Sequence, residues 1–245
     1  MTLKMSTYHV TVRKRLKKLA KPSVKEGYEN YFKKVTIFHG VKTLGVKRVM
    51  KETLPLLSDK SIESIVKEAF SLLESDYSEE KQIGVGLLSR QVKKLPENFL
   101  RMLEPVFERG VYDWATCDGI AGRVLRPLLK KDKKTLSHIV SWSLSKNIWR
   151  KRASAVAFVN EARHGDYNNE IMLVCSRLAG HPERFVQLGM GWVLRELFLA
   201  DQEAVLKFLR KNYEGISREG LRYALEKMPD PLKKKILQEH KEELM

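Results

Sequence analysis

Five segments rich in small residues recur along the chain at intervals of 33 to 36 residues, and this spacing constrains the fold more than any other feature. They begin near Lys81, Trp114, Trp149, Phe185 and Arg218. Apolar residues recur every three or four positions, as in amphipathic helices, and strand-like alternation is scarce. A period in the thirties with two helices per unit is typical of an α-solenoid. We therefore predict an all-α helical-repeat fold in which each small-residue segment is the inner helix of a pair.

The remaining helical segments support one continuous array. Helical spacing of apolar residues covers 62–73, 99–107, 136–144, 153–162, 185–198, 203–209 and 219–227. Short punctuating segments with capping residues or proline separate them, and no long linker interrupts the pattern. The chain has 245 residues, 43% of them hydrophobic, which is enough for one elongated domain. We predict a single helical repeat domain over 1–245, with basic N-terminal helices over 1–51 and helix pairs over about 52–241.

Positive charge is concentrated at the beginning of the chain. The net charge is +16, and residues 1–51 contain 14 Lys or Arg against only Glu26 and Glu29. Such a region is typical of a protein that binds a polyanion. A solubility-driven surface or a disordered arm is the alternative, but aromatic residues interrupt the run and favour a folded segment. The expected phosphate contacts are Lys33, Lys34, Lys42, Lys47 and Arg48.

Several functional classes are excluded by composition. Cys117 and Cys175 lie far apart in the sequence, and the six histidines form no short-range cluster. A disulfide framework and a structural zinc site are therefore not expected, and we predict no metal and no cofactor. No apolar run approaches the ~20 residues that span a bilayer, and no apolar leader follows the early lysines. We expect a cytoplasmic protein, associated with the nucleoid if it is prokaryotic.

Trp114 and Asp118 carry the clearest chemical signal. Four residues separate them, so on a helix they lie one turn apart on the same face. An indole ring beside a carboxylate suits a cationic, electron-poor ligand. In a strongly basic protein, that ligand fits a nucleic acid containing a positively charged base, such as an alkylated purine. Either residue alone is more often structural, the tryptophan in the core and the aspartate in an ion pair.

Repeat alignment adds residues from later segments. Inner helices of a solenoid stack side by side, so matching positions in consecutive repeats become neighbours. This brings Arg150, Arg152 and Trp192 to the same groove as the Trp114–Asp118 pair, with Arg195 one turn further along. We predict a concave, basic groove that binds DNA. Trp142 and Trp149 are expected in the core or in the layer behind the groove.

Four motifs in matching order resemble the AlkD-type DNA alkylation-repair glycosylases, which are built from HEAT-like helical repeats. The motifs are Phe-His-Gly-Val-Lys-Thr (38–43), Trp-Ala-Thr-Cys-Asp (114–118), Ile-Trp-Arg-Lys-Arg-Ala (148–153) and Gly-Trp-Val-Leu-Arg-Glu (191–196). The similarity spans roughly residues 28 to 228. Leu44 stands where the family pattern has a proline after the first motif, which leaves the start of the following helix open.

The resemblance implies hydrolytic release of N3- and N7-alkylated purines from double-stranded DNA by a monofunctional enzyme. It assigns Asp118 as the catalytic aspartate, Trp114 and Trp192 as the two cleft tryptophans, and Arg152 as the cleft arginine with Arg150 as the alternative. Arg150 and Arg195 are also expected to contact DNA. Because the alkylated base already carries positive charge, a carboxylate near the sugar would stabilise the developing oxocarbenium ion. A groove that embraces a duplex is compatible with a monomer.

A non-catalytic helical-repeat module that binds DNA or protein is the second hypothesis. The carboxylate at position 118 separates the two, because an acid facing a polyanion weakens simple binding. The expected consequence is that Asp118→Asn abolishes excision and retains DNA binding.

Overall fold

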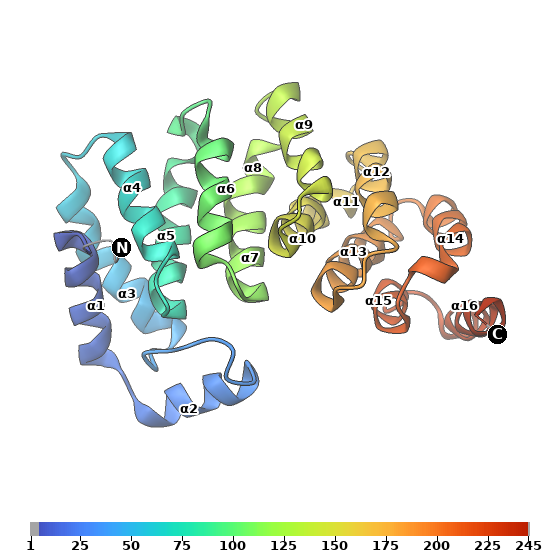
Figure 1. Cartoon of the computed structure of the whole chain (residues 1–245), viewed down its shortest axis with the longest axis horizontal. Helices are drawn as coiled ribbons and strands as arrows, with labels where there is room; N and C mark the ends of the chain where they lie inside the picture. The colour runs from blue at the N-terminus through green and yellow to red at the C-terminus, as the bar shows by residue number, and fades with distance from the viewer. Residues whose placement is uncertain (1–4, 245) are drawn as a thin grey trace. The chain divides into compact units, whose positions relative to one another are not determined.

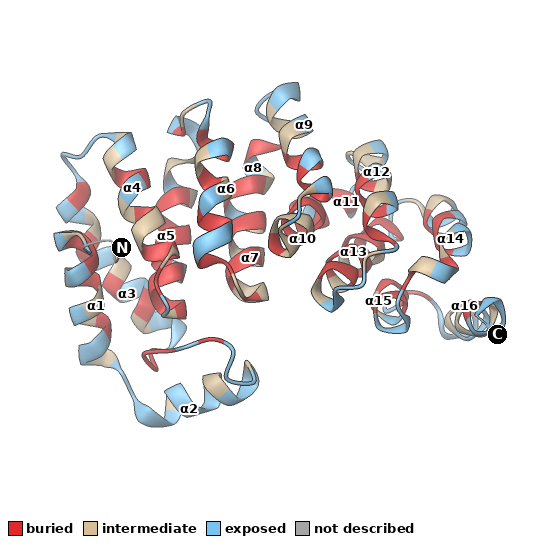
Figure 2. Ribbon diagram, viewed as in Figure 1, coloured by how far each residue is buried: buried red, intermediate tan, exposed pale blue. Residues whose placement is uncertain are grey.

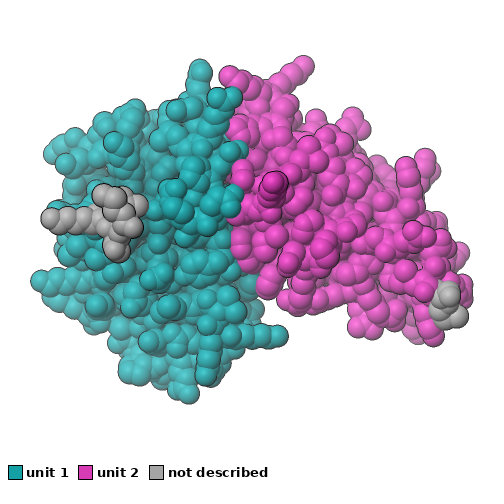
Figure 3. Space-filling model, viewed as in Figure 1, with its two compact units in different colours: residues 1–124 teal, residues 125–245 magenta. Residues whose placement is uncertain are grey.

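A computed structural model describes residues 5–244, and these residues form helices joined by turns and, over 32–42, by a longer connection (Figure 1). The only extended pairing in this part of the chain is an isolated bridge between Ile37 and Tyr77. The predicted all-α helical-repeat fold is therefore confirmed. Two compact units make up the chain, unit 1 (Met1–Val124) and unit 2 (Leu125–Met245), coloured separately in Figure 3. The single domain expected over 1–245 stays a prediction.

Unit 1 contains seven named α-helices within its described residues. They are α1 (Thr7–Leu19), α2 (Pro22–Tyr31), α3 (Thr43–Thr53), α4 (Ile62–Leu73), α5 (Ser78–Gln91), α6 (Phe99–Gly110) and α7 (Trp114–Ile120), with 3-10 turns at Leu54–Leu57 and Val92–Lys94. Helix α5 packs against α3, α4 and α7, while α4 also packs against α6. The helices thus form two layers, one with α3, α5 and α7 and the other with α4 and α6 (Figure 1). Helix α2 has no buried residue.

Unit 2 repeats this arrangement. Its helices are α8 (Arg126–Leu128), α9 (Lys133–Ser141), α10 (Ile148–Val156), α11 (Val159–Ala162), α12 (Asn168–Leu178), α13 (Arg184–Leu197), α14 (Gln202–Lys211), α15 (Arg218–Ala224) and α16 (Asp230–Glu243), with 3-10 turns at Trp142–Leu144 and Tyr213–Gly215. A π-helical turn, Ala121–Leu125, precedes α8, and all of it except Leu125 belongs to unit 1. Helix α13 packs against α10 and α15 in one layer, and α9 packs against α12 in the other.

The five small-residue segments become α5, α7, α10, α13 and α15, as the repeat spacing predicts. Their glycines permit close helix packing. A Cβ added at Gly84 would lie 2.8 Å from the carbonyl oxygen of Ala69 on α4, and one at Gly191 would lie 2.5 Å from that of Gly220 on α15. Side chains larger than glycine would force these neighbouring helices apart.

Short polar side chains determine where several helices begin. Asp113, Asp132 and Asp201 each accept a hydrogen bond from the backbone N–H three residues further on, at 2.8, 2.7 and 3.0 Å. Ser217 does the same for Gly220 at 3.1 Å. Such caps satisfy backbone donors that the helix itself leaves unpaired. Helix α3 begins at Thr43 although Leu44 replaces the expected proline.

Each unit has its own apolar core. In unit 1, α4, α5 and α6 bury Leu72, Ile83 and Phe107 completely. In unit 2, the buried set includes Trp142 and Trp149, at 2% and 8% exposure, which confirms the expected core position of both tryptophans. Figure 2 shows buried residues along the faces where neighbouring helices meet. Cys117 and Cys175 are also buried and form no disulfide.

Ion pairs between consecutive repeats add a second kind of contact. Within unit 1, Arg109 binds Glu74 at 2.6 Å. Within unit 2, Arg126 binds Glu161 and Arg163 binds Glu196, each at 2.8 Å, and Arg184 pairs with Glu219. The partners are 33 to 35 residues apart, as the hydrogen bonds between them show. The same repeat period therefore appears in the apolar core and in the charged pairs.

Among the described helices, none combines the length and apolar character that a bilayer crossing requires.

Candidate functional site

Helix α7 begins in a tightly fixed turn. Asp113 is the N-cap, is only 3% exposed, and accepts hydrogen bonds from the backbone N–H and the hydroxyl of Thr116 at 2.8 and 2.9 Å. Trp114 is the first residue of the helix. The capped start leaves little freedom for the backbone that carries this side chain.

Trp114 and Asp118 lie one helical turn apart on α7, and both are half-buried. Phe32 stacks on Trp114, with ring centroids 5.2 Å apart and planes inclined by 11°. Tyr31 contacts the same indole edge-on at 6.3 Å. Aromatic side chains from the end of α2 therefore hold the indole, and the sequence pattern did not indicate this contact.

The five predicted phosphate contacts of unit 1 are all exposed. Lys33 and Lys34 follow α2 and adopt positive φ angles of 51° and 60°, a conformation uncommon outside glycine. Lys42 is the N-cap of α3, and Lys47 lies on its exposed side. Arg48 pairs with Glu52 at 2.8 Å, so binding a phosphate would compete with that contact. Lys33 and Lys34 follow Phe32 directly, next to the ring that covers Trp114.

Hydrogen bonds to the first residues of α5 hold the segment that lies between Lys34 and Lys42. We call residues 36–41 the strap. The carboxylate of Glu79 accepts the backbone N–H groups of His39, Gly40 and Val41 at 2.9 to 3.0 Å. Ser78 donates its backbone N–H to the carbonyl of Ile37 at 2.9 Å. Glu79 is fully buried, and these three donors satisfy both of its carboxylate oxygens.

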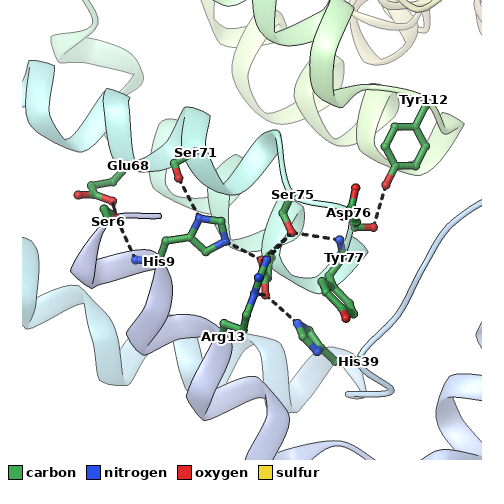
Figure 4. Close-up of polar contacts among 11 residues, drawn as sticks. Ser6, His9, Arg13, His39, Glu68, Ser71, Ser75, Asp76, Tyr77 and Tyr112 are labelled. Atoms are coloured by element: carbon green, nitrogen blue, oxygen red, sulfur yellow. Dashed lines mark hydrogen bonds and ion pairs between the residues drawn. The ribbon is translucent and has the colours of Figure 1, made fainter. Parts of the chain in front are cut away.

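Glu80, next to Glu79, is the centre of a buried polar cluster. Figure 4 labels its partners His9, Arg13, His39 and Ser75. His9 and His39 donate their Nε2–H groups to its two carboxylate oxygens at 2.6 and 2.8 Å. Arg13 donates from Nε at 2.7 Å, and Ser75 donates its hydroxyl at 2.6 Å. Burial alone would raise the pKa of Glu80, but these four donors outweigh it and hold the pKa far below its usual range. The cluster connects α1, the strap and α5.

In unit 2, Arg152 is a buried residue rather than a freely extended one. It is 5% exposed, and Nη1 donates to the carbonyl oxygen of Phe185 at 2.7 Å. Gly189 packs against its stem, because a Cβ there would lie 3.0 Å from Cγ of Arg152. Arg150, one position before Lys151 on the same helix, is half-buried.

Trp192 on α13 is half-buried and stands beside Arg195, whose guanidinium lies 5.9 Å from the indole centroid and 4.8 Å from the Tyr223 ring. Arg195 also binds Glu196 at 3.0 Å and Glu226 at 2.6 Å. Its side chain is 13% exposed. Arg195, predicted to contact DNA, is therefore paired with two carboxylates and lies beside the indole of Trp192.

Glu196 is one of these two carboxylates. It is 1% exposed and accepts hydrogen bonds from Lys227 at 2.6 Å and Arg163 at 2.8 Å in addition to Arg195. Burial would raise the pKa of Glu196, but the three cations outweigh this effect and leave the pKa below its ordinary value. A completely paired buried carboxylate of this kind stabilises the geometry around it.

Of the residues that the family resemblance assigns, Trp114 and Asp118 belong to unit 1, and Arg152 and Trp192 belong to unit 2. Sequence reasoning did not identify three contact residues: Phe32, which stacks on Trp114, Glu80, which binds the strap, and Lys81, which binds the turn before α7. Glu79-Glu80-Lys81 is a charged run at a helix start, and such runs are usually solvated. Here all three residues are fully buried. Within the described residues, no group of His, Cys, Asp and Glu is arranged to hold a metal ion.

The sequence matches the family described as "DNA alkylation repair enzyme" over residues 12–228. The chain belongs to this family. A solved structure from Enterococcus faecalis, described as a predicted DNA alkylation repair enzyme, is similar with a TM-score of 0.76 and 14% sequence identity. The similarity covers 86% of this chain and 97% of that one. At this identity the likeness establishes the fold. A comparison with curated proteins gave no match.

Proposed function

We propose that this DNA alkylation repair protein is a monofunctional DNA glycosylase. It hydrolyses the N-glycosidic bond of N3- and N7-alkylated purines in double-stranded DNA and requires no cofactor. The observation that carries the proposal is the pair on α7: a half-exposed carboxylate, Asp118, one turn from a half-exposed indole, Trp114, in a member of this family. The exposed lysines of unit 1 supply the affinity for the phosphate backbone.

The chemistry follows from the charge of the lesion. Alkylation at N3 or N7 makes the purine cationic, so it can leave without being protonated. As the glycosidic bond breaks, positive charge develops on the deoxyribose ring. The carboxylate of Asp118 stabilises this charge and orients the attacking water. Trp114, held by Phe32, packs against the sugar and excludes bulk solvent, which strengthens the electrostatic interaction.

The remaining residues that the family resemblance assigns lie in unit 2. Trp192, which lies beside Arg195, is the second cleft indole. Arg152 is the cleft arginine and Arg150 the phosphate contact. Comparing Arg150→Ala with Arg152→Ala tests this assignment, because loss of the cleft arginine slows excision at saturating enzyme, whereas loss of a phosphate contact weakens binding and reduces the dependence of affinity on salt.

The deciding experiment measures release of 7-methylguanine from a duplex under single-turnover conditions. We expect Asp118→Asn to reduce the rate by roughly 100- to 1,000-fold, as for loss of one electrostatic contact to a transition state, while the dissociation constant for the duplex changes little. Asp59→Asn, at an exposed turn of unit 1, is the matched control and leaves the rate unchanged.

Equal rates for the wild type and Asp118→Asn would remove Asp118 from the mechanism. DNA binding by the wild type without release of any cationic base would instead identify the protein as a non-catalytic binding module.

A further inference from the structure

Lys81 on α5 is a fully buried lysine whose ammonium group binds no carboxylate among the described residues. Its Nζ donates a hydrogen bond to the carbonyl oxygen of Gly110 at 2.6 Å. The same nitrogen lies 3.3 Å from the centroid of the Tyr112 ring. A main-chain carbonyl and an aromatic face both favour a cation, but neither neutralises it. A buried charge of this kind costs stability, and here it is held against the segment that precedes α7.

The groups that contact Lys81 belong to the turn that starts α7. Gly110 ends α6 and packs so closely on α4 that a Cβ there would lie 2.4 Å from the carbonyl oxygen of Leu73. Tyr112 donates its hydroxyl to the carbonyl oxygen of Asp76 at 2.8 Å (Figure 4). The next residue, Asp113, caps α7. Lys81 therefore binds two of the four residues that precede Trp114.

Two carboxylates act on the ammonium group of Lys81. Asp76 in the turn between α4 and α5 and Asp113 before α7 both favour the ammonium form, while burial opposes it more strongly. Burial accordingly lowers the pKa of Lys81 to about 8. Tyr112 stays neutral over this range, because burial raises the pKa of its hydroxyl. On the ends of α4 and α6, Glu74 and Arg109 pair with each other at 2.6 Å.

We propose that Lys81 is a positioning residue for the reaction, whose charged ammonium fixes the start of α7 and so the orientation of Trp114 and Asp118. The inference rests on the proposed glycosylase function and extends it to a residue that no recognised motif includes. When Lys81 loses its proton, the attraction to the Tyr112 ring and to the Asp76 and Asp113 carboxylates is lost. Asp113 then caps α7 without a nearby counter-charge, and the turn that carries Trp114 loosens.

This proposal gives opposite pH dependences for activity and for stability. Excision falls as the pH rises through about 8, because the charged form of Lys81 disappears. In the unfolded chain the lysine keeps its ordinary pKa of 10.5, so between these values the unfolded state binds the extra proton. Raising the pH over this range therefore favours the folded state as far as Lys81 is concerned. A purely structural lysine would not make activity fall where its own contribution to stability rises.

The test measures single-turnover excision of 7-methylguanine between pH 6.5 and 9.5 by the full-length protein, with spontaneous base loss subtracted. For the wild type we expect a total fall of about tenfold, centred near pH 8 and levelling off above about pH 9, as for titration of one group whose neutral form keeps about a tenth of the rate. Lys81→Met should have a rate about tenfold lower at pH 7 and no alkaline fall. Circular dichroism at each pH establishes that both proteins remain folded.

Tyr112 provides a matched pair of variants. Tyr112→Phe keeps the ring over the ammonium and loses only the hydroxyl contact, so the alkaline fall should stay near pH 8. Tyr112→Leu removes the aromatic face, which shifts the fall by about one pH unit toward acid. An alkaline fall that persists unchanged in Lys81→Met, or that stays at the same pH in Tyr112→Leu, overturns the proposal.

A readout independent of excision separates this inference from the proposed function. In protein labelled with 5-fluorotryptophan, the resonance of Trp114 is assigned by its absence from Trp114→Phe. Its ¹⁹F shift should titrate near pH 8 in the wild type and not in Lys81→Met. If this titration is observed in a protein that releases no base, the structural link stands and the glycosylase proposal is wrong. If Trp114 does not titrate, the link itself is wrong.

Discussion

At the scale of single residues, the stack of Phe32 on Trp114 is the contact most directly open to test. We expect Phe32→Leu to slow excision about 3- to 10-fold, because an aromatic pair contributes roughly 0.5–1.5 kcal/mol beyond its buried area. The rate is measured with enzyme in excess over duplex, so weaker binding does not contribute. Phe70→Leu, which removes the Phe70–Phe99 pair at 6.0 Å on α4 and α6, is the matched control. A similar loss in both variants would mean that Phe32 acts only through general stability.

Glu80 accepts hydrogen bonds from four side chains of unit 1. Glu80→Gln leaves Arg13 without its carboxylate and should lower the free energy of unfolding by about 3–5 kcal/mol, as for other broken buried ion pairs. Urea unfolding at pH 7 measures the difference. Glu63→Gln, an exposed change on α4, should stay within about 0.5 kcal/mol.

The decrease of the free energy of unfolding at acid pH provides a second test of the same carboxylate. The pKa of Glu80 is lowered in the folded state, so its contribution is complete above the ordinary value of 4.5 and is lost as the pH falls toward the folded value. Between pH 5 and 2 the wild type should therefore lose more stability than Glu80→Gln. An equal loss of unfolding free energy in the two proteins over this pH range would show that Glu80 is not ionised in the cluster.

At the scale of helices, the sequence pattern predicted most of what the structure shows. The segment predicted over 62–73 is α4 with the same bounds, and the five small-residue segments became five helices of one kind. These features depend on apolar spacing and on capping residues, which are local. The stack on Trp114 and the burial of Glu79, Glu80 and Lys81 depend on contacts with residues tens of positions away. No local pattern distinguishes them from an ordinary charged helix start.

Gly191 on α13 is closely packed and Gly27 on α2 is not, so the same substitution should have opposite effects on stability at the two positions. Gly191→Ala should destabilise the protein by roughly 2–4 kcal/mol, because the new methyl group would meet the backbone of α15 at 2.5 Å. Gly27 in α2 has nothing within 4 Å of an added Cβ. Gly27→Ala should therefore stabilise by about 0.5–1 kcal/mol through helix propensity. Urea unfolding measures both, and changes of the same sign would contradict the packing argument.

At the scale of the whole molecule, the distribution of charge is the property that bears on DNA binding. The net charge of +16 is concentrated in the first 51 residues, and the basic residues predicted to contact DNA there are exposed. Two acidic side chains, Glu80 and Glu196, are paired with arginine and lysine inside their units. Exposed cations of unit 1 are thus available for phosphates, while the buried acids stabilise the helical repeats.

Affinity for duplex DNA should therefore fall steeply with salt. If about six phosphates are neutralised, a plot of log association constant against log salt concentration has a slope near −5. Replacing Lys42 and Lys47 together with glutamine should reduce that slope by about two, since each phosphate contact contributes about 0.9. Lys234 and Lys235 on α16 are also exposed, and their double replacement by glutamine removes the same charge from the other end of the chain. Equal slopes for the two double variants, measured by fluorescence anisotropy between 50 and 250 mM salt, would show that affinity depends on net charge alone and not on the basic surface of unit 1.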